Sequence, residues 1–356
     1  MSERPTPFLQ VGLDVLDANI AAMARFAAER GLALRTHAKT HKAPELARRQ
    51  LAAGAVGLTV ATVSEAEVFA AAGAPDVFVA YPLWVDASRG ARVRALAQRT
   101  RVTVGIDSVE GARALAANAP GTRVVVEVDS GQHRTGVRPA AAGPLAAGAA
   151  HAGLDVVGVF TFPGHSYAPD AREVAAADEA HALSEARDSL SEHGIEPVVV
   201  SGGSTPSAGV ADDSVLTEIR PGVYLFGDAQ QWELGTMQPK DVGLWALGTV
   251  VSHGHGEAGE RQIVLDTGSK TLGADRASYA SGYGRLLDHP DARITQLSEH
   301  HAVVTWPHDE LPAHGSRLRV VPNHVCAAVN LHDELVVSSA HDEPRTWSIT
   351  ARGANT

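Results

Sequence analysis

The sequence predicts an α/β protein, a (β/α)8 TIM barrel followed by an all-β domain. Eight short, β-branched apolar runs occur early in the chain, and Ala-rich amphipathic stretches separate them. The runs are residues 32–36, 56–61, 77–81, 102–106, 124–128, 156–160, 197–200 and 216–219. They are apolar nearly throughout, as expected for parallel strands covered on both faces. Eight alternations within roughly 200 residues fit a closed barrel better than an open sheet.

Helix start and stop signals lie between the runs. Pro44 opens a predicted helix at 44–53, Ser64 and Glu67 form the pattern of a capping box at 64–72, and Ser108 can cap 108–117. A long helix is predicted at 171–193. Pro206 and Gly209 shorten the helix after the seventh run.

The pattern changes after about residue 237. Short apolar runs at 250–251, 262–266, 301–305, 317–321 and 334–338 are separated by Gly, Pro and His-Asp turns, without a strong helical period. We therefore expect a barrel domain at 14–237 and a β domain at 238–356 that also takes in residues 1–13.

Composition excludes several classes of protein. The net charge is −11 without a basic patch, which argues against nucleic acid and anionic membranes as partners. No apolar run approaches the roughly 20 residues of a membrane-spanning helix, and the N-terminus lacks a signal sequence. Cys326 is the single cysteine, so an internal disulfide is impossible and a reducing cytoplasm is expected.

Lys39 follows the first run, and His37 and His41 flank it. Chemistry in such barrels takes place at the C-terminal ends of the strands, so this amine is expected at the mouth of the barrel. There it can form a Schiff base with an aldehyde. The alternative is a solvated lysine at the start of a helix.

The seventh run leads into a glycine turn with hydroxyl side chains, which includes Gly203, Ser204 and Thr205. Converging backbone N–H groups at such a turn favour an anion, and a phosphate site late in a barrel is a recurring arrangement. The alternative is an ordinary loop. A Schiff-base lysine and a phosphate loop at one mouth together indicate pyridoxal 5′-phosphate.

Three further residues follow the fifth and sixth runs. Arg134 can contact a phenolate oxygen or a substrate carboxylate, or it can form a surface salt bridge. His165 and Tyr167 can line a cofactor pocket, or they can pack the mouth of the barrel.

His324 and Cys326 lie outside the predicted barrel. Imidazole and thiolate are ligands that suit Zn²⁺, and two protein ligands would leave open positions for substrate or water. The alternative is a buried free cysteine beside an unrelated histidine.

Taken together, these segments resemble the D-serine dehydratase/D-threonine aldolase family of fold-type III pyridoxal-phosphate enzymes, which are related to alanine racemase. Residues 35–42 read Arg-Thr-His-Ala-Lys-Thr-His-Lys and are similar to the family's Arg-Pro-His-x-Lys-[Thr/Ala]-His-Lys, with Thr36 in place of proline. Residues 128–137 resemble its Val-Asp-x-Gly-x-x-Arg-x-Gly-Val segment. Later blocks match in order, although His300 replaces the common glutamate. The resemblance covers about residues 8–353.

The resemblance implies roles for these residues and a homodimer. Lys39 would hold the cofactor as a Schiff base, and Arg134 would contact its phenolic oxygen. The remaining roles are phosphate binding by Gly203, Ser204 and Thr205, lining of the pocket by His165 and Tyr167, and metal binding by His324 and Cys326.

Two reactions divide this family, and both act on small D-β-hydroxy amino acids. A dehydratase eliminates the β-hydroxyl and yields a 2-oxo acid and ammonia, whereas an aldolase breaks the Cα–Cβ bond and yields glycine and an aldehyde. The His-x-Cys pair favours Zn²⁺ and a dehydratase, because aldolases of this type tend to carry His-x-Asp with Mn²⁺ or Mg²⁺. An amino-acid racemase and a non-catalytic pyridoxal-phosphate carrier are the remaining alternatives.

Overall fold

The computed structural model describes residues 4–340 and 343–356. Residues 1–3 and 341–342, which the sequence analysis placed in the β domain, lie outside the described part. The chain divides into two compact units. The barrel unit consists of Ala21–Lys39, Pro44–Gly222 and Gly353–Thr356, and the β unit takes in the residues up to Ile20, Thr40–Ala43 and Val223–Arg352.

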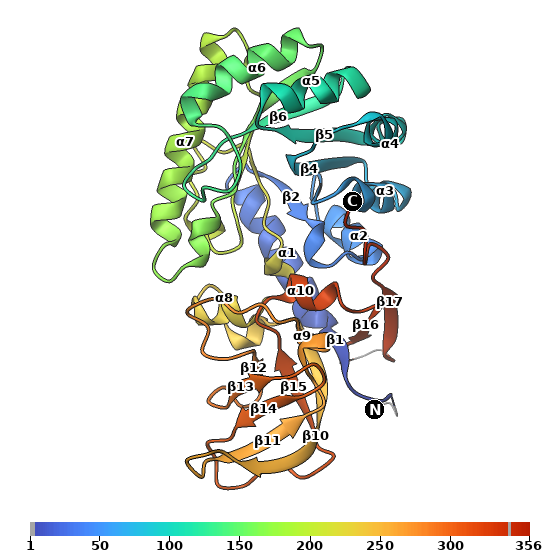
Figure 1. Ribbon diagram of the computed structural model, residues 1–356, viewed down its shortest axis with the longest axis vertical. Coiled ribbons are helices and arrows are strands. Elements are labelled where there is room, and N and C mark those ends of the chain that lie inside the picture. The colour runs from blue at the N-terminus through green and yellow to red at the C-terminus, as the bar shows by residue number, and fades with distance from the viewer. Residues whose placement is uncertain (1–3, 341–342) are drawn as a thin grey trace. The chain divides into compact units, whose positions relative to one another are not determined.

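The barrel unit confirms the predicted fold class, because eight parallel strands close in sequence order (Figure 1). They are β2 (Ala33–His37), β3 (Gly57–Val60), β4 (Asp76–Pro82), β5 (Arg101–Ile106), β6 (Arg123–Glu127), β7 (Asp155–Phe160), β8 (Val199–Gly202) and β9 (Glu218–Ile219). Each coincides with one of the eight apolar runs. β2 pairs with β9 as well as with β3, which closes the barrel.

Helices cover the outside of the barrel (Figure 1). After α1 (Leu13–Glu29) they are α2 (Pro44–Ala52), α3 (Val63–Ala71), α4 (Ala87–Ala97), α5 (Val109–Asn118), α6 (Ala142–His151) and α7 (Arg172–Glu192). Ser108 caps α5 as predicted, since its side chain accepts the N–H of Gly111. The cap predicted for α3 is wrong: Thr62, not Ser64, accepts the N–H of Glu65. Only a 3-10 turn, Ala208–Val210, follows β8.

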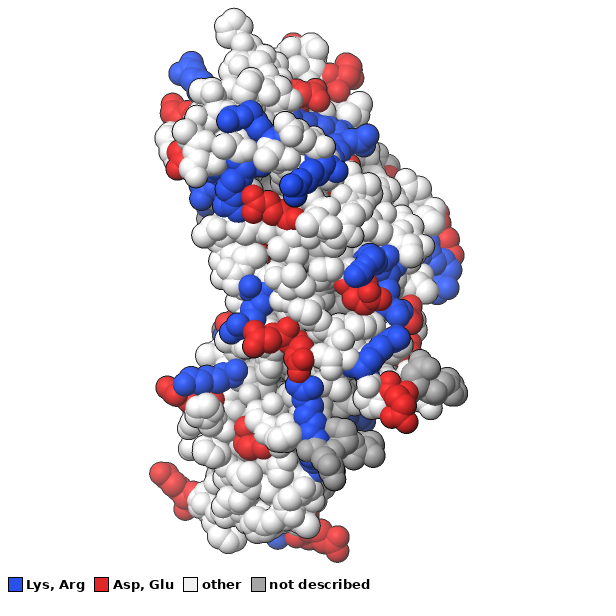
Figure 2. All heavy atoms as spheres, turned by 90° about the vertical axis from the view of Figure 1, so that its right-hand side faces the viewer, with Lys and Arg blue, Asp and Glu red and all other residues white. Residues whose placement is uncertain are grey.

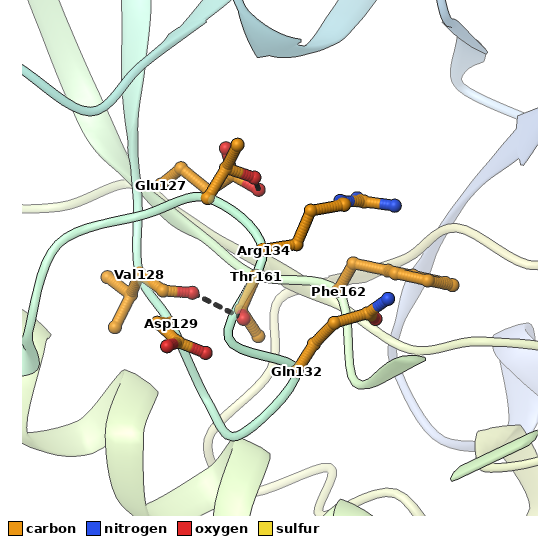
Figure 3. Close-up of a pocket in the computed structure, with 8 residues that line it drawn as sticks. Glu127, Val128, Asp129, Gln132, Arg134, Thr161 and Phe162 are labelled. Atoms are coloured by element: carbon orange, nitrogen blue, oxygen red, sulfur yellow. Dashed lines mark hydrogen bonds between the residues drawn. The ribbon is translucent and has the colours of Figure 1, made fainter. Parts of the chain in front are cut away.

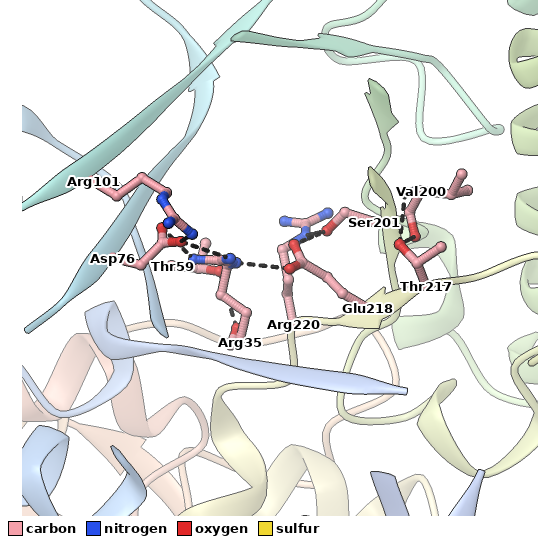
Figure 4. Close-up of polar contacts among 9 residues, drawn as sticks. All are labelled: Arg35, Thr59, Asp76, Arg101, Val200, Ser201, Thr217, Glu218 and Arg220. Carbon is pink, nitrogen blue, oxygen red and sulfur yellow. Dashed lines mark hydrogen bonds and ion pairs between the residues drawn. The ribbon is translucent and has the colours of Figure 1, made fainter. Parts of the chain in front are cut away.

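An ion network occupies part of the barrel interior (Figure 4). The Arg35 guanidinium, on β2, lies 2.7 Å from Asp76 and 2.8 Å from Glu218, and all three side chains are buried. Arg35 reaches Asp76 across Gly57 of β3, where any Cβ would collide with both residues. Ser201 donates to Glu218 at 2.7 Å and therefore extends the network to β8. A buried charge is tolerated only when it is paired in this way.

The β unit is built on one sheet in the order β11-β14-β13-β12-β15-β10-β1-β16-β17, and a further β10–β11 pairing makes the strands from β10 to β15 a closed circuit. Its strands are β1 (Phe8–Gly12), β10 (Leu244–His255), β11 (Arg261–Leu265), β12 (Arg285–Leu286), β13 (Arg293–Leu297), β14 (Ala302–Thr305), β15 (Arg317–Val321), β16 (Glu334–Ser338) and β17 (Arg345–Ser348). Its short helices are α8 (Ala229–Glu233), α9 (Ser269–Leu272) and α10 (Val325–Val329). The N-terminal segment takes part in this sheet, because β1 pairs with β10 and β16. The sequence analysis missed β12, β13 and β17 and all three helices.

The C-terminal residues return to the barrel unit beside α3 (Figure 1). Ser64 donates its N–H to Thr356 at 2.9 Å, and the Thr62 hydroxyl donates to Ala354 at 2.7 Å.

Within the barrel part of the face in Figure 2, Lys and Arg side chains gather with Asp and Glu among them. In the barrel unit, an ion pair joins Arg92 of α4 to Glu67 of α3 at 2.8 Å. Among the described residues, no helix combines the length and apolar character needed to cross a bilayer.

Candidate active site

Lys39 lies where β2 ends, in the 3-10 turn Ala38–Thr40. The N–H of His37 donates to Pro221 at 3.0 Å, which fixes the end of β2 beside the segment that follows β9. The Lys39 ammonium lies over the ring of Phe162, with Nζ 5.8 Å from the ring centroid. The amine is therefore at the C-terminal mouth of the barrel, the side on which such barrels carry out chemistry.

Phe162 brings three of the sequence-predicted residues together. The Arg134 guanidinium lies 5.5 Å from the centroid of the same ring, and the Tyr167 ring lies 6.2 Å from it. Figure 3 shows the side chain of Arg134, from the loop after β6, and that of Phe162, from the segment after β7, extending in the same direction. An aromatic face attracts cations, so Phe162 offers a favourable contact to both Lys39 and Arg134. The sequence analysis missed Phe162.

A small cavity of about 10 Å³ lies under Arg134 and is lined by Glu127, Thr161 and Phe162, among others (Figure 3). That is the space of about one water molecule. Burial raises the pKa of Glu127, against a hydrogen bond from Thr135 and the charge of Arg134. Burial thus disfavours the charged form of this carboxyl group, and Arg134 and Thr135 oppose that effect.

His165 lies against the loop that carries Arg134. Gly131 has a φ of 119°, and a Cβ there would come within 3.1 Å of the His165 ring. Nε2 of His165 also lies 3.2 Å from Asp178 of α7. Because Gly131 has no side chain, the His165 ring can pack against its backbone. His165 and Tyr167 both lie in the 3-10 turn Gly164–Tyr167, which follows β7.

The predicted phosphate loop begins at the end of β8. Gly203 has a φ of 76°, the left-handed conformation that glycine adopts without strain. The Ser204 hydroxyl lies 2.9 Å from Ser166 and 2.8 Å from Ser207, and all three serines are buried. This hydroxyl cluster joins the phosphate loop to the turn with His165 and Tyr167. The sequence analysis did not identify Ser166 or Ser207.

Lys42, the second lysine of residues 35–42, has a different environment. It precedes α2, has a φ of 52° and is buried. Its ammonium donates to the Asn330 side chain at 2.8 Å within the β unit. The two lysines of the segment are therefore distinguished by their surroundings, and only Lys39 lies by Phe162.

His324 and Cys326 lie at the start of α10 in the β unit, where His324 is the N-cap residue. Nδ1 of His324 is buried, makes no hydrogen bond to the described residues and lies 3.5 Å from the buried Asp228 carboxylate. The Cys326 thiolate raises the pKa of His324 to about 11, assisted by Asp228 and opposed by burial. The Cys326 sulfur also contacts the Thr40 hydroxyl at 3.3 Å.

This pair has the chemistry of a metal site. A buried imidazole nitrogen beside a carboxylate is the arrangement that orients a histidine ligand, and a thiolate is a strong ligand for Zn²⁺. Among residues 4–340 and 343–356, no group of three or more His, Cys, Asp and Glu side chains is placed to hold a metal ion. The site would thus rest on two protein ligands, with Asp228 as a residue that the sequence analysis missed.

Two family models match the chain. The alanine racemase N-terminal domain matches residues 11–230, and a putative serine dehydratase domain matches residues 243–338. The chain belongs to the D-serine dehydratase/D-threonine aldolase family. It is therefore a pyridoxal-phosphate-dependent lyase of the fold-type III class, as the sequence analysis predicted.

Characterised relatives within this family span nearly the whole chain. D-threo-3-hydroxyaspartate dehydratase from Delftia is 33% identical over 96% of this chain and 96% of its own length. D-threonine aldolase from Arthrobacter is 33% identical over 98% of this chain and 93% of its own length. The two reactions of the family are thus represented at the same level of identity.

Solved structures of the family divide in the same way. A histidine-to-alanine variant of the Delftia dehydratase superposes with a TM-score of 0.89 at 31% identity, covering 97% of this chain and 95% of that chain. A cysteine-to-alanine variant, two positions further along that protein, is a metal-free form. D-threonine aldolase from Filomicrobium marinum has a TM-score of 0.88 at 31% identity, covering 99% of this chain and 97% of that chain.

Proposed function

We propose that this family member is a metal-assisted dehydratase that converts D-β-hydroxy amino acids into a 2-oxo acid and ammonia. The observation that carries the proposal is the pair His324 and Cys326, beside a buried carboxylate at the start of α10. Its spacing equals that of the histidine and cysteine replaced in the Delftia dehydratase variants. A thiolate ligand favours Zn²⁺ over Mn²⁺ or Mg²⁺.

The barrel residues fit pyridoxal phosphate in chemistry and in placement. When bound, the cofactor supplies an electron sink for the charge that develops at Cα. The Lys39 amine would hold the cofactor aldehyde and then take the Cα proton. Arg134 would bind the phenolic oxygen, since its guanidinium shares the Phe162 ring with Lys39. Gly203 would form the turn of the loop that binds the phosphate, together with Ser204 and Thr205.

His324 and Cys326 would hold the divalent cation, whose contribution is to polarise the β-hydroxyl as a Lewis acid. Asp228 would keep the His324 ring oriented through Nδ1. His165 and Tyr167 would line the substrate side of the pocket. The homodimer expected from the family resemblance stays a prediction.

D-threonine aldolase activity is the second candidate, because two aldolases match the chain as well as the dehydratase does. The two reactions give different products from the same substrates. The purified protein is incubated with D-serine, D-threonine and D-threo-3-hydroxyaspartate, with and without a chelator. We expect 2-oxo acid and ammonia that disappear when the metal is removed.

Glycine and an aldehyde would instead identify an aldolase. Racemised substrate, formed equally well with the chelator, would identify a racemase. A Lys39-bound cofactor without turnover of any D-amino acid would identify a non-catalytic carrier.

A further inference from the structure

Glu179 lies in the middle of α7 with only 1% of its surface exposed, and its carboxyl group reaches the back of the phosphate loop. Oε1 accepts the N–H of Gly203 at 2.7 Å. A Cβ on Gly202 would collide with the same oxygen. A buried carboxyl group thus lies against the backbone of two successive glycines, and helix α7 fixes its position.

Gly203 is held from both sides. On the side away from Glu179, a Cβ on Gly203 would come within 3.1 Å of Ile219 in β9. Its φ of 76° is open to glycine at little cost, so the conformation of the loop depends on what fixes it. The hydrogen bond to Glu179 supplies that constraint and orients the backbone that continues into Ser204.

The charge of Glu179 matters as well as its position. Oε2 is buried and accepts no hydrogen bond from the described residues. Burial raises the pKa of Glu179 to about 7, while the Gly203 N–H and the charge of Arg220 lower it. Arg220 is the one described charge that acts appreciably on Glu179, and its own donors go to Ser201 and to the Thr161 carbonyl.

We propose that Glu179 is a positioning residue for the cofactor phosphate: its carboxyl group fixes Gly202 and Gly203 from behind and sets the loop to receive the anion. This inference rests on the proposed pyridoxal-phosphate site. A phosphate dianion bound at the loop disfavours a second negative charge behind it, so bound cofactor favours the neutral acid. Cofactor binding is then coupled to uptake of a proton by Glu179.

The test compares pyridoxal 5′-phosphate with pyridoxal, which lacks the phosphate. Dissociation constants for both are measured by absorbance titration of the full-length protein, in the wild type, Glu179→Ala and Glu179→Gln. We expect Glu179→Ala to lower the preference for the phosphorylated form about tenfold or more, with pyridoxal binding little changed. Glu179→Gln, which keeps an acceptor for Gly203, should retain most of the preference.

Glu65 provides the matched control. It is equally buried on a barrel helix, and its Oε2 accepts the N–H of Ala61 at 2.7 Å beyond the end of β3, where no predicted cofactor ligand lies. Glu65→Gln should leave the preference unchanged. Thermal unfolding of each variant separates loss of fold from loss of phosphate binding.

The pH dependence provides a second readout, independent of whether Glu179→Ala folds. Binding with proton uptake weakens as pH rises above the pKa of the free carboxyl group, by at most about tenfold per pH unit for one proton. From about pH 6 to about pH 8.5, wild-type affinity for the phosphorylated form should fall more steeply than that of Glu179→Gln.

Equal preference in wild type and Glu179→Ala would overturn the inference while leaving the proposed function intact. Equal pH profiles in wild type and Glu179→Gln would do the same. If the wild type forms no Lys39-dependent complex with either aldehyde, the proposed cofactor site itself is wrong, and the role of Glu179 falls with it.

Discussion

At the scale of single residues, the site depends on which side chains meet at the barrel mouth. Lys39 and Arg134 lie far apart in the sequence, yet both lie over the ring of Phe162. Phe162 therefore gives the amine and the guanidinium a common aromatic contact at the mouth of the barrel.

Replacing Lys39 with Ala should remove the visible absorbance of lysine-bound cofactor. Activity should fall by about 10²–10⁴-fold, the contribution of a positioned proton-transfer group. Lys270→Ala is the matched control, because Lys270 is an exposed lysine of the β unit paired with Glu299. Absorbance spectra and product assays of both variants test this, and a spectrum that survives in Lys39→Ala contradicts the assignment.

Zn²⁺ affinity should rise with pH. The pKa of His324 is about 11, so this imidazole carries a proton throughout the neutral range and must release it to bind a metal. Release of one proton strengthens binding by about tenfold per pH unit. The measurement is competition with a chromophoric chelator from about pH 6 to about pH 8.

Cys326→Ser provides the control for this dependence. It removes the main cause of the raised pKa of His324, so the imidazole should lose its proton at a lower pH. The variant should bind metal weakly, and its affinity should level off at a lower pH than that of the wild type. If metal affinity rises with pH at the same slope in both proteins, the Cys326 thiolate is not the cause of the raised pKa of His324.

Sequence patterns predicted roles for Lys39, Arg134 and the loop with Gly203, Ser204 and Thr205, because strand ends mark the mouth of a barrel. They could not identify Phe162 or Glu179. Phe162 is one more apolar residue beside β7, and Glu179 is one of several acids on a long helix. Only the closed barrel shows which of them points toward the loops, so their roles depend on tertiary packing.

At the scale of elements, eight strands were predictable because each is a short apolar run between helix signals. β12 and β17 were not, since they are two and four residues long and contain arginine. The ion network that joins β2, β4, β8 and β9 was equally hidden, because Arg35 reaches Asp76 only across a glycine of β3. An arginine inside an apolar run gives no sign of its partners.

Replacing Arg35 with Met should destabilise the protein by about 3–5 kcal/mol, because it leaves Asp76 and Glu218 buried without their cation. Denaturant unfolding measures this.

Arg101→Met is the matched control for Arg35→Met. Arg101 lies 3.6 Å from the same Asp76, but its side chain is 66% exposed. A pair of this kind contributes at most about 1 kcal/mol. Similar losses of unfolding free energy in the two variants would mean that burial of Arg35 does not determine its contribution to stability.

At the scale of the whole molecule, the residues proposed to hold the cofactor and those proposed to hold the metal belong to different units. Lys39, Arg134 and Gly203 lie in the barrel unit, whereas His324, Cys326 and Asp228 lie in the β unit. Each set is assembled by the packing of its own unit. The family models divide at nearly the same place, between residues 230 and 243.

Cofactor and metal should therefore load independently. Cys326→Ala should lose metal but keep the absorbance of Lys39-bound cofactor, and Lys39→Ala should lose that absorbance but keep metal. Both variants should lose turnover, because elimination needs the electron sink and the polarised hydroxyl together. Metal content and cofactor absorbance are measured on the same samples. If either variant loses both the metal and the cofactor while remaining folded, the two sites bind cooperatively and not independently.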